Sequence, residues 1–129
     1  MLEDKWALVV ENDAHSLVAI SSILRDLGIH FKRNTTGANV IEQICAMNPR
    51  PDFVLLDIDL PHSAAFSINL HIQSDPLLRA IPVIAVGSVI DFAVRQRLHH
   101  DGFATFVPKP LPRRQFGNLV QRILGGDEG

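Results

Sequence analysis

The sequence alternates short apolar segments with longer amphipathic ones, and this alternation constrains the fold more than any other feature. The segments predicted as strands are 7–10, 29–32, 53–56, 82–86 and 104–107. Between them, apolar residues such as Leu17, Ile20 and Leu24 recur every three or four positions, which is the period of a helix. Strands that alternate with helices form a parallel sheet covered on both faces. We therefore predict an α/β fold with a doubly wound, five-stranded parallel sheet.

Capping residues indicate where several helices begin and end. Asp13 is the expected N-cap of the first helix, and Gly28 is its expected C-terminal stop. Thr36 is expected to cap the second helix, whose apolar face includes Val40 and Ile44. The remaining helices are predicted at about 64–73, at 91–99 and around 116–123. The strand at 29–32 is short, so we expect it near an edge of the sheet.

Length and composition limit the class of protein. A chain of 129 residues with 47% hydrophobic residues supports one domain, expected over 1–129 with its core at about 6–124. A net charge of −2 gives no sign of a nucleic-acid partner. The charged N-terminus and the short apolar run 7–10 exclude a signal peptide or membrane span there. Cys45 is the only cysteine, which excludes an internal disulfide. These features predict a cytoplasmic protein.

Polar residues follow four of the predicted strands at their carboxyl ends. They are Glu11, Asn12 and Asp13 after the first strand, Asp57 and Asp59 after the third, Gly87 and Ser88 after the fourth, and Lys109 after the fifth. In doubly wound sheets these ends meet at one edge, where ligands bind. Taken singly, Asp13 is explained as a helix cap, Lys109 as a surface lysine and Asp59 as a side chain that faces solvent. The joint placement of Glu11, Asp57 and Lys109 is what predicts a site.

Carboxylates gathered at one edge raise one another's pKa unless a cation joins them. Oxygen ligands of this kind suit Mg²⁺, which takes one or two carboxylates and keeps several waters. Lys109 can pair with a carboxylate or with a phosphoryl oxygen. Asp57 can act as a nucleophile and form an acyl phosphate. The sequence therefore predicts phosphoryl chemistry at this edge.

The chain resembles response-regulator receiver domains of the chemotaxis-regulator type over essentially its full length. The matching segments are 8–11, 52–61, 74–76, 81–86, Gly102 and the Lys109-Pro110 pair. The resemblance implies a flavodoxin-like (βα)5 receiver fold. It also implies Mg²⁺-dependent transfer of a phosphoryl group to Asp57 from a sensor histidine kinase or a histidine phosphotransfer protein. The domain itself would be a signalling module rather than a classical enzyme.

The same resemblance assigns a role to each residue of the cluster. Mg²⁺ would be held by Glu11 through water, by Asn12, by Asp57 and by the backbone carbonyl of Asp59. Lys109 and the backbone N–H of Ser88 would bind the phosphoryl group, and Gly87, Ser88 and Phe106 occupy the switch positions. Output would pass from the fourth helix, fifth strand and fifth helix to an unknown downstream protein. Neither a nucleic acid nor a membrane is expected as a direct partner.

Two departures from the family pattern bear on function. Asn12 stands where the family has a second aspartate, so we expect Mg²⁺ to bind weakly. Gly87 stands where the family has a Thr or Ser hydroxyl, and Ser88 can replace it only if the loop shifts by one residue. These departures make the receiver atypical.

Two alternatives stay open at this point. The first is a phosphorylation-independent pseudo-receiver, a docking or dimerisation module that would use the face around 92–99 and the last helix, and a homodimer is possible. The second is a haloacid-dehalogenase-like phosphatase, because Asp57 and Asp59 form an Asp-x-Asp pair. The pair follows the third strand rather than the first, which disfavours the phosphatase.

Overall fold

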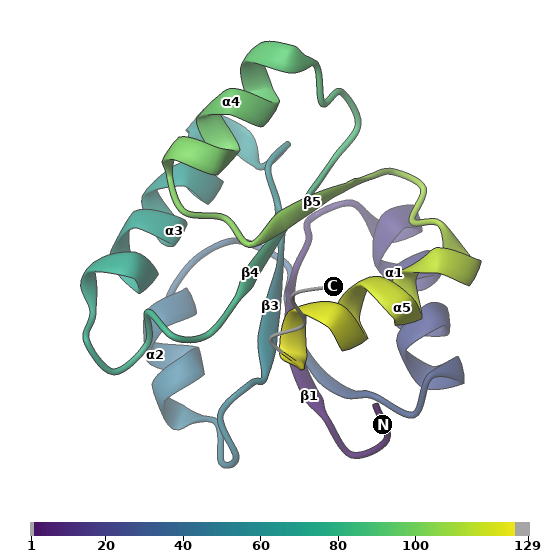
Figure 1. Cartoon of the computed structure of the whole chain (residues 1–129). Coiled ribbons are helices and arrows are strands. Elements are labelled where there is room, and N and C mark those ends of the chain that lie inside the picture. The colour runs from purple at the N-terminus through teal and green to yellow at the C-terminus, as the bar shows by residue number, and fades with distance from the viewer. Residues whose placement is uncertain (1, 126–129) are drawn as a thin grey trace.

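The computed structural model describes residues 2–125 and contains five strands and five α-helices in alternation (Figure 1). The elements are β1 (Trp6–Val10), α1 (Ala14–Asp26), β2 (His30–Asn34), α2 (Val40–Ala46), β3 (Phe53–Asp57), a 3₁₀ turn (Pro61–Ser63), α3 (Ala64–Ser74), β4 (Val83–Gly87), α4 (Phe92–His100), β5 (Thr105–Pro108) and α5 (Arg113–Leu124). All neighbouring strands are parallel, in the order β2-β1-β3-β4-β5. The predicted doubly wound sheet is confirmed.

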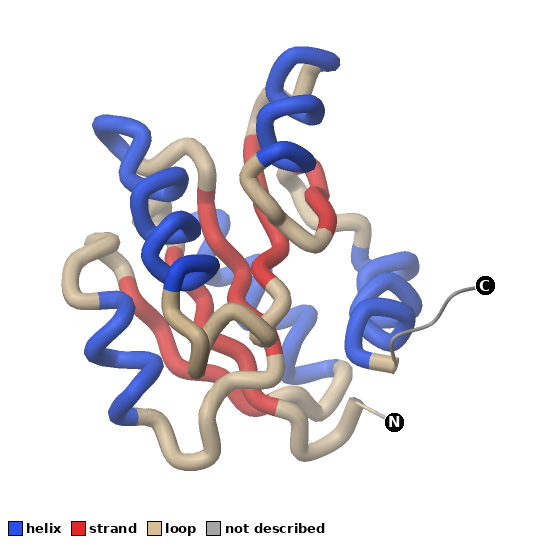
Figure 2. Tube along the Cα trace, turned by 60° about the vertical axis from the view of Figure 1, so that its left-hand side comes forward, coloured by secondary structure: helices blue, strands red, loops and turns tan. Residues whose placement is uncertain are grey.

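Helices cover both faces of the sheet, and the strands divide their side chains between two cores (Figure 2). Side chains of a strand point alternately to opposite faces. Val9 and Leu55 therefore pack with α1 and α5, whereas Leu8 and Leu56 pack with α2, α3 and α4. All five residues of β3 are buried, so this strand places Asp57 in the middle of the sheet with little freedom to move.

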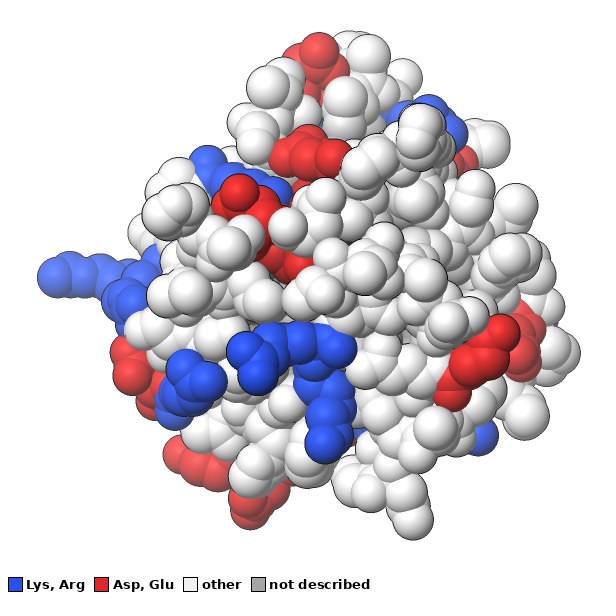
Figure 3. Space-filling model, turned by 180° about the vertical axis from the view of Figure 1, so that it is seen from behind, with Lys and Arg blue, Asp and Glu red and all other residues white. Residues whose placement is uncertain are grey.

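The strand β2 lies at an edge of the sheet, as predicted, but it begins at His30 and reaches Asn34. Its side chains at His30, Lys32 and Arg33 are exposed, and Figure 3 shows a group of basic side chains on the lower part of the rear face. Charged side chains on an edge strand discourage pairing with another chain. No helix within residues 2–125 is long and apolar enough to cross a membrane.

The expected caps of α1 are confirmed. The side chain of Asp13 accepts a hydrogen bond from the N–H of Ser16 at 2.8 Å, and Gly28 follows the helix with a left-handed φ of 75°. The expected cap of α2 is wrong. Thr36 precedes the helix by several residues, and its hydroxyl oxygen accepts only the N–H of Ala38, whereas α2 begins after Asn39.

Asn34 organises the turn that Thr36 was expected to control. Its side-chain oxygen accepts the N–H groups of Thr36 and Gly37, at 3.3 and 2.8 Å, and its amide nitrogen donates to Ala38 and Gln43. Because Asn34 is buried at the end of β2, these bonds fix the path from the edge strand into α2. The backbone carbonyl of Asn34 also accepts the N–H of Glu11.

Replacing Asn34 by Ala should destabilise the protein by about 2 kcal/mol, because three backbone groups of the turn and the side chain of Gln43 lose their partners. The matched variant Thr36→Val removes one exposed hydroxyl and should change the free energy of unfolding by less than about 0.5 kcal/mol. Urea denaturation followed by the fluorescence of the single tryptophan, Trp6, measures both. Equal losses in the two variants would contradict this account of the turn.

Candidate functional site

The carboxyl ends of four neighbouring strands bring the predicted site residues together. Asp57 is the last residue of β3 and pairs with Val86 of β4. Gly87, the last residue of β4, pairs with Pro108 of β5, directly before Lys109. Glu11 follows β1, which lies on the other side of β3. Acidic side chains, with basic side chains beside them, are visible toward the upper part of the rear face (Figure 3).

Lys109 contacts three carboxylates. Its Nζ lies 3.1 Å from Oε2 of Glu11, 3.2 Å from Oδ1 of Asp57 and 3.7 Å from Oδ2 of Asp59. Burial alone would lower the pKa of Lys109, but its hydrogen bonds to Glu11 and Asp57 outweigh that effect and raise the pKa. Lys109 therefore stays protonated and partly neutralises the acids.

Glu11 is buried and holds its carboxyl group against the site. Burial and the neighbouring carboxyl of Asp57 raise the pKa of Glu11 from 4.5 to about 7, although the N–H of Asp13 and the ammonium of Lys109 lower it. Its Oε2 accepts the N–H of Asp13 at 3.1 Å, whereas its Oε1 is buried and has no hydrogen-bond partner in the part of the chain that the structure describes. This orphan oxygen is an unusual feature, since buried polar atoms are normally paired.

Asp57 is bonded on one oxygen only. Its Oδ1 accepts the backbone N–H of Asp59 at 2.8 Å and lies beside Lys109, whereas its Oδ2 is buried without a hydrogen-bond partner among residues 2–125. Two unpaired carboxylate oxygens, one on Asp57 and one on Glu11, are what a cation with bound waters would satisfy. Within residues 2–125 no group of three or more His, Cys, Asp or Glu side chains forms a ready metal cage. Mg²⁺ does not need such a cage, because it keeps several waters.

Asn12 and Asp13 are both exposed beside Glu11. The side chain of Asp13 is engaged as the cap of α1, and its hydrogen bonds with Ser16 lower the pKa of Asp13. Asp13 is therefore engaged at the start of α1, and Asn12 is the neighbouring residue whose side chain carries an amide oxygen.

The side chain of Asp59 does not face solvent alone, contrary to the expectation from sequence. Its Oδ2 accepts both the backbone N–H of Ser88, at 2.9 Å, and the hydroxyl of Ser88, at 2.8 Å. Replacement of the missing hydroxyl by Ser88 required a shift of the loop by one residue, and in this arrangement the Ser88 hydroxyl donates to Asp59. The link joins the loop after β3 to the loop after β4, and sequence reasoning missed it.

Gly87 has the backbone conformation of an ordinary strand residue, so a left-handed φ does not explain the glycine. The explanation is the lack of room for a side chain. A Cβ atom at this position would lie 2.7 Å from Cγ1 and 2.9 Å from Cδ1 of Ile58. Ile58 therefore fills the space next to Gly87 in which a larger side chain would start. Ile58 could not be predicted from the sequence, because it lies just after the strand and belongs to no apolar repeat.

Phe106, the third predicted switch position, is partly buried on β5. The guanidinium carbon of Arg95, from α4, lies 5.9 Å from the centre of its ring. Phe106 therefore packs on the α4 side of the sheet, two residues before Pro108 at the end of β5.

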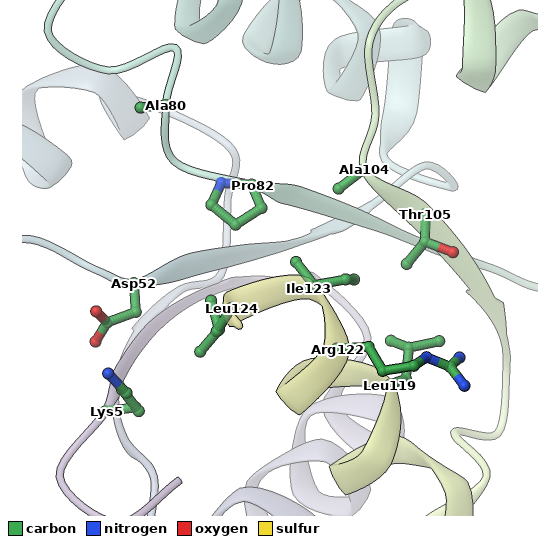
Figure 4. Close-up of a pocket in the computed structure, with 10 residues that line it drawn as sticks. All are labelled: Lys5, Asp52, Ala80, Pro82, Ala104, Thr105, Leu119, Arg122, Ile123 and Leu124. Carbon is green, nitrogen blue, oxygen red and sulfur yellow. The ribbon is translucent and has the colours of Figure 1, made fainter. Parts of the chain in front are cut away.

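A hollow of about 830 Å³ lies at the opposite end of the sheet from the carboxylates (Figure 4). It is lined by Lys5, Asp52, Ala80, Pro82, Ala104, Thr105, Leu119, Arg122, Ile123 and Leu124. Asp52, its one acid, accepts the backbone N–H of Trp6 at 2.8 Å. This carboxylate is thus occupied in fixing the start of β1, and the hollow lacks the convergence of acids found at the carboxyl ends.

Comparisons with known proteins agree with this geometry. The family model for the response regulator receiver domain matches residues 7–122. The polar-differentiation response regulator DivK of Brucella anthropi is 26% identical over 121 residues, which cover 94% of this chain and 97% of that protein. The structure of a response regulator receiver protein from Burkholderia phymatum is 28% identical, with a TM-score of 0.80 and coverage of 95% and 96%.

A third likeness includes a metal. The receiver domain of a sensor histidine kinase from Pseudomonas aeruginosa, whose structure is described with a magnesium ion coordinated in the active site cleft, is 24% identical. Its TM-score is 0.83, and the match covers 95% of this chain and 98% of that one. At 24% identity, this likeness supports the fold of the chain and nothing further.

The raised pKa of Glu11 predicts how stability depends on pH. The folded protein binds a proton at Glu11 more tightly than the unfolded chain, so stability should fall as pH rises from 4.5 to about 7. The loss should be on the order of 3 kcal/mol. Glu11→Gln cannot titrate, so its urea midpoint should depend less on pH across this window. The same pH dependence in both proteins would contradict the assignment.

Proposed function

The chain belongs to the response regulator receiver domain family of two-component signalling, and from this premise we propose that Asp57 is its phosphoacceptor. The donor is a sensor histidine kinase or a histidine phosphotransfer protein, and the reaction depends on Mg²⁺. Residues 1–129 act as one receiver domain, with its core at about 6–124, in the cytoplasm. The output is carried by contacts with another protein.

The observation that carries this proposal is the asymmetric bonding of Asp57. One carboxylate oxygen is fixed by the N–H of Asp59 and by Lys109, whereas Oδ2 has no partner. An unbonded carboxylate oxygen keeps its lone pairs for attack on phosphorus. The attack forms the acyl phosphate bond and breaks the phosphorus–nitrogen bond of phosphohistidine, and the imidazole leaves and takes up a proton.

Mg²⁺ would be held by Glu11 through water, by Asn12, by Asp57 and by the backbone carbonyl of Asp59. The ion supplies neutralisation of the negative charge on the phosphoryl oxygens. The fit rests on the two unpaired buried oxygens of Glu11 and Asp57. Asn12 contributes an amide oxygen in place of a carboxylate, so the site lacks one negative charge and Mg²⁺ binds weakly.

Lys109 and Ser88 are the proposed phosphoryl-binding residues. The ammonium of Lys109 already lies 3.2 Å from Asp57, so an added phosphoryl group would meet a positive charge. Ser88 follows β4 at the neighbouring strand end, and its backbone N–H is bonded to Asp59 in the unphosphorylated protein. The ammonium of Lys109 is preorganised by the sheet, which reduces the cost of binding the transferred group.

The output surface is proposed to include α4, β5 and α5, with Gly87, Ser88 and Phe106 as the switch positions. Only Leu98 of α4 is buried, and Phe92 at its start is 69% exposed. An exposed aromatic residue near a loop that adjoins the site suits a contact whose geometry changes with phosphorylation. The same surface is available to a downstream protein or to a second copy of the chain.

A phosphorylation-independent docking module is the second candidate, and two observations favour it. Asn12 weakens the metal site, and Ile58 fills the space beside Gly87 where the family has a hydroxyl-bearing side chain. The buried acids and Lys109 favour the phosphoacceptor instead, because a docking module gains nothing from burying charges. A phosphatase is disfavoured, since the Asp-x-Asp pair follows β3 in a receiver fold.

Incubation with acetyl phosphate and Mg²⁺ should add one phosphoryl group to the intact protein. Asp57→Asn keeps the volume of the side chain but removes the nucleophilic carboxylate, so it should give no adduct. Chelation of Mg²⁺ should abolish the adduct on the natural protein as well. Intact-mass spectrometry measures each case. A folded protein that never gains the adduct, even at high Mg²⁺, would leave only the docking module.

Asn12→Asp should restore the missing carboxylate and strengthen Mg²⁺ binding. The Mg²⁺ concentration that gives half-maximal labelling should fall about tenfold, which corresponds to about 1.4 kcal/mol. Titration of Mg²⁺ at fixed acetyl phosphate provides the measurement. A half-maximal concentration that stays the same would show that Asn12 does not contact the ion.

A further inference from the structure

The carboxylate of Asp59 already contacts Ser88 and Lys109, the two residues that are proposed to bind the phosphoryl group. Its Oδ2 accepts the N–H of Ser88 at 2.9 Å and the hydroxyl of Ser88 at 2.8 Å. The same oxygen lies 3.7 Å from Nζ of Lys109. A single carboxylate oxygen thus collects a backbone donor, a hydroxyl donor and an ammonium group.

These contacts tie together three strand ends. Asp59 lies in the loop after β3, Ser88 follows β4, and Lys109 follows β5. Ser88 is also the first residue of segment 88–91, which leads into α4 and carries Val89, 70% exposed. A bond from Asp59 to Ser88 therefore restrains the segment through which a change at the site would reach α4.

Gly87 and Ile58 leave Ser88 as the donor at this strand end. Gly87 has no side-chain hydroxyl, and Ile58 packs against the face from which one would project, at 2.7 Å from the position of a Cβ. At the end of β4, Ser88 is therefore the residue that would donate a hydrogen bond to a phosphoryl group on Asp57. Ser88, however, is occupied by Asp59.

A phosphoryl group on Asp57 and the carboxylate of Asp59 cannot both keep these donors. An aspartyl phosphate carries about −1.5 to −2 charges if it resembles other protein phosphates. The two carboxylates are close, because Nζ of Lys109 lies 3.2 Å from Oδ1 of Asp57 and 3.7 Å from Oδ2 of Asp59. Like charges at this range repel, and each needs cationic or N–H partners. The site therefore contains a competition between its resident carboxylate and the incoming group.

We propose that Asp59 is a positioning residue that holds Ser88 and Lys109 in the unphosphorylated protein and competes with the phosphoryl group for them. Modification of Asp57 transfers Ser88 from Asp59 to the phosphoryl group and frees segment 88–91 from the β3 loop. Asp59 thereby slows entry of the phosphoryl group and links its arrival to α4. This inference rests on the proposed function of Asp57.

A metal-binding role for the side chain of Asp59 would change the phosphorylation rate in the opposite direction. If its side chain were a ligand that strengthens the Mg²⁺ site, its removal would slow phosphorylation and raise the Mg²⁺ requirement. If it competes as proposed, its removal speeds phosphorylation at saturating Mg²⁺. The sign of one rate change therefore separates the two roles.

The test compares initial rates of labelling by acetyl phosphate at saturating Mg²⁺, measured by intact mass on the full chain. Asp59→Ala should label about fivefold faster, which corresponds to about 1 kcal/mol of competition removed. Asp59→Asn keeps an acceptor oxygen for Ser88 without the charge, so it should show a smaller gain. A slower or unchanged rate in Asp59→Ala would overturn the inference.

Asp13→Asn is the matched control for charge. The carboxylate of Asp13 also acts on Lys109 through its charge, and Asn caps a helix as well as Asp does. This variant should label at nearly the natural rate, because it leaves the bonds of Ser88 in place. A gain equal to that of Asp59→Ala would show that net charge alone sets the rate, and the competition would be rejected.

A second readout does not depend on phosphorylation. Exchange of the Ser88 amide proton with water, measured by NMR, should be about fivefold faster in Asp59→Ala, because its acceptor is gone. Unchanged exchange would overturn the inference. If neither the natural protein nor Asp59→Ala gains an adduct, the proposed phosphoacceptor function fails, and the competition fails with it. Labelling of both at equal rates rejects the competition alone.

Discussion

The ammonium group of Lys109 is shared by the carboxylates of Glu11, Asp57 and Asp59, and the site depends on this positive charge. Buried charges are costly unless they are paired, so the sheet must hold this lysine in place. It does so through register: Gly87 pairs with Pro108, and the carbonyl of Gly87 accepts the N–H of Lys109. The order of the strands then brings the β1, β3 and β5 ends to the same edge.

One lysine does not balance three acids, and the imbalance explains the remaining features of the site. The pKa of Glu11 rises to about 7, chiefly because of burial, and buried oxygens of Glu11 and Asp57 have no partner. A proton or a divalent cation can correct this excess of negative charge. The proposed need for Mg²⁺ and the competition at Asp59 therefore have the same origin, which is a site with more acceptors than donors.

The sequence predicted the parts of the structure that periodicity and strand ends determine. The apolar run before Asp57 indicated a buried central strand, and the strand order β2-β1-β3-β4-β5 brings Glu11 and Lys109 near its end. The parts that failed depend on contacts between loops. Thr36 looked like a cap because of its type, but Asn34 controls that turn through bonds in three dimensions. The bonds between Asp59 and Ser88 likewise have no periodic signal.

The most direct test of the account is the location of the phosphoryl group. Borohydride reduces an acyl phosphate of aspartate to homoserine, and tandem mass spectrometry then identifies the modified position. We predict homoserine at position 57 alone after labelling with acetyl phosphate and Mg²⁺. Homoserine at position 59, or a phosphoryl adduct that resists reduction and maps to another residue type, would contradict the assignment of Asp57 as the acceptor.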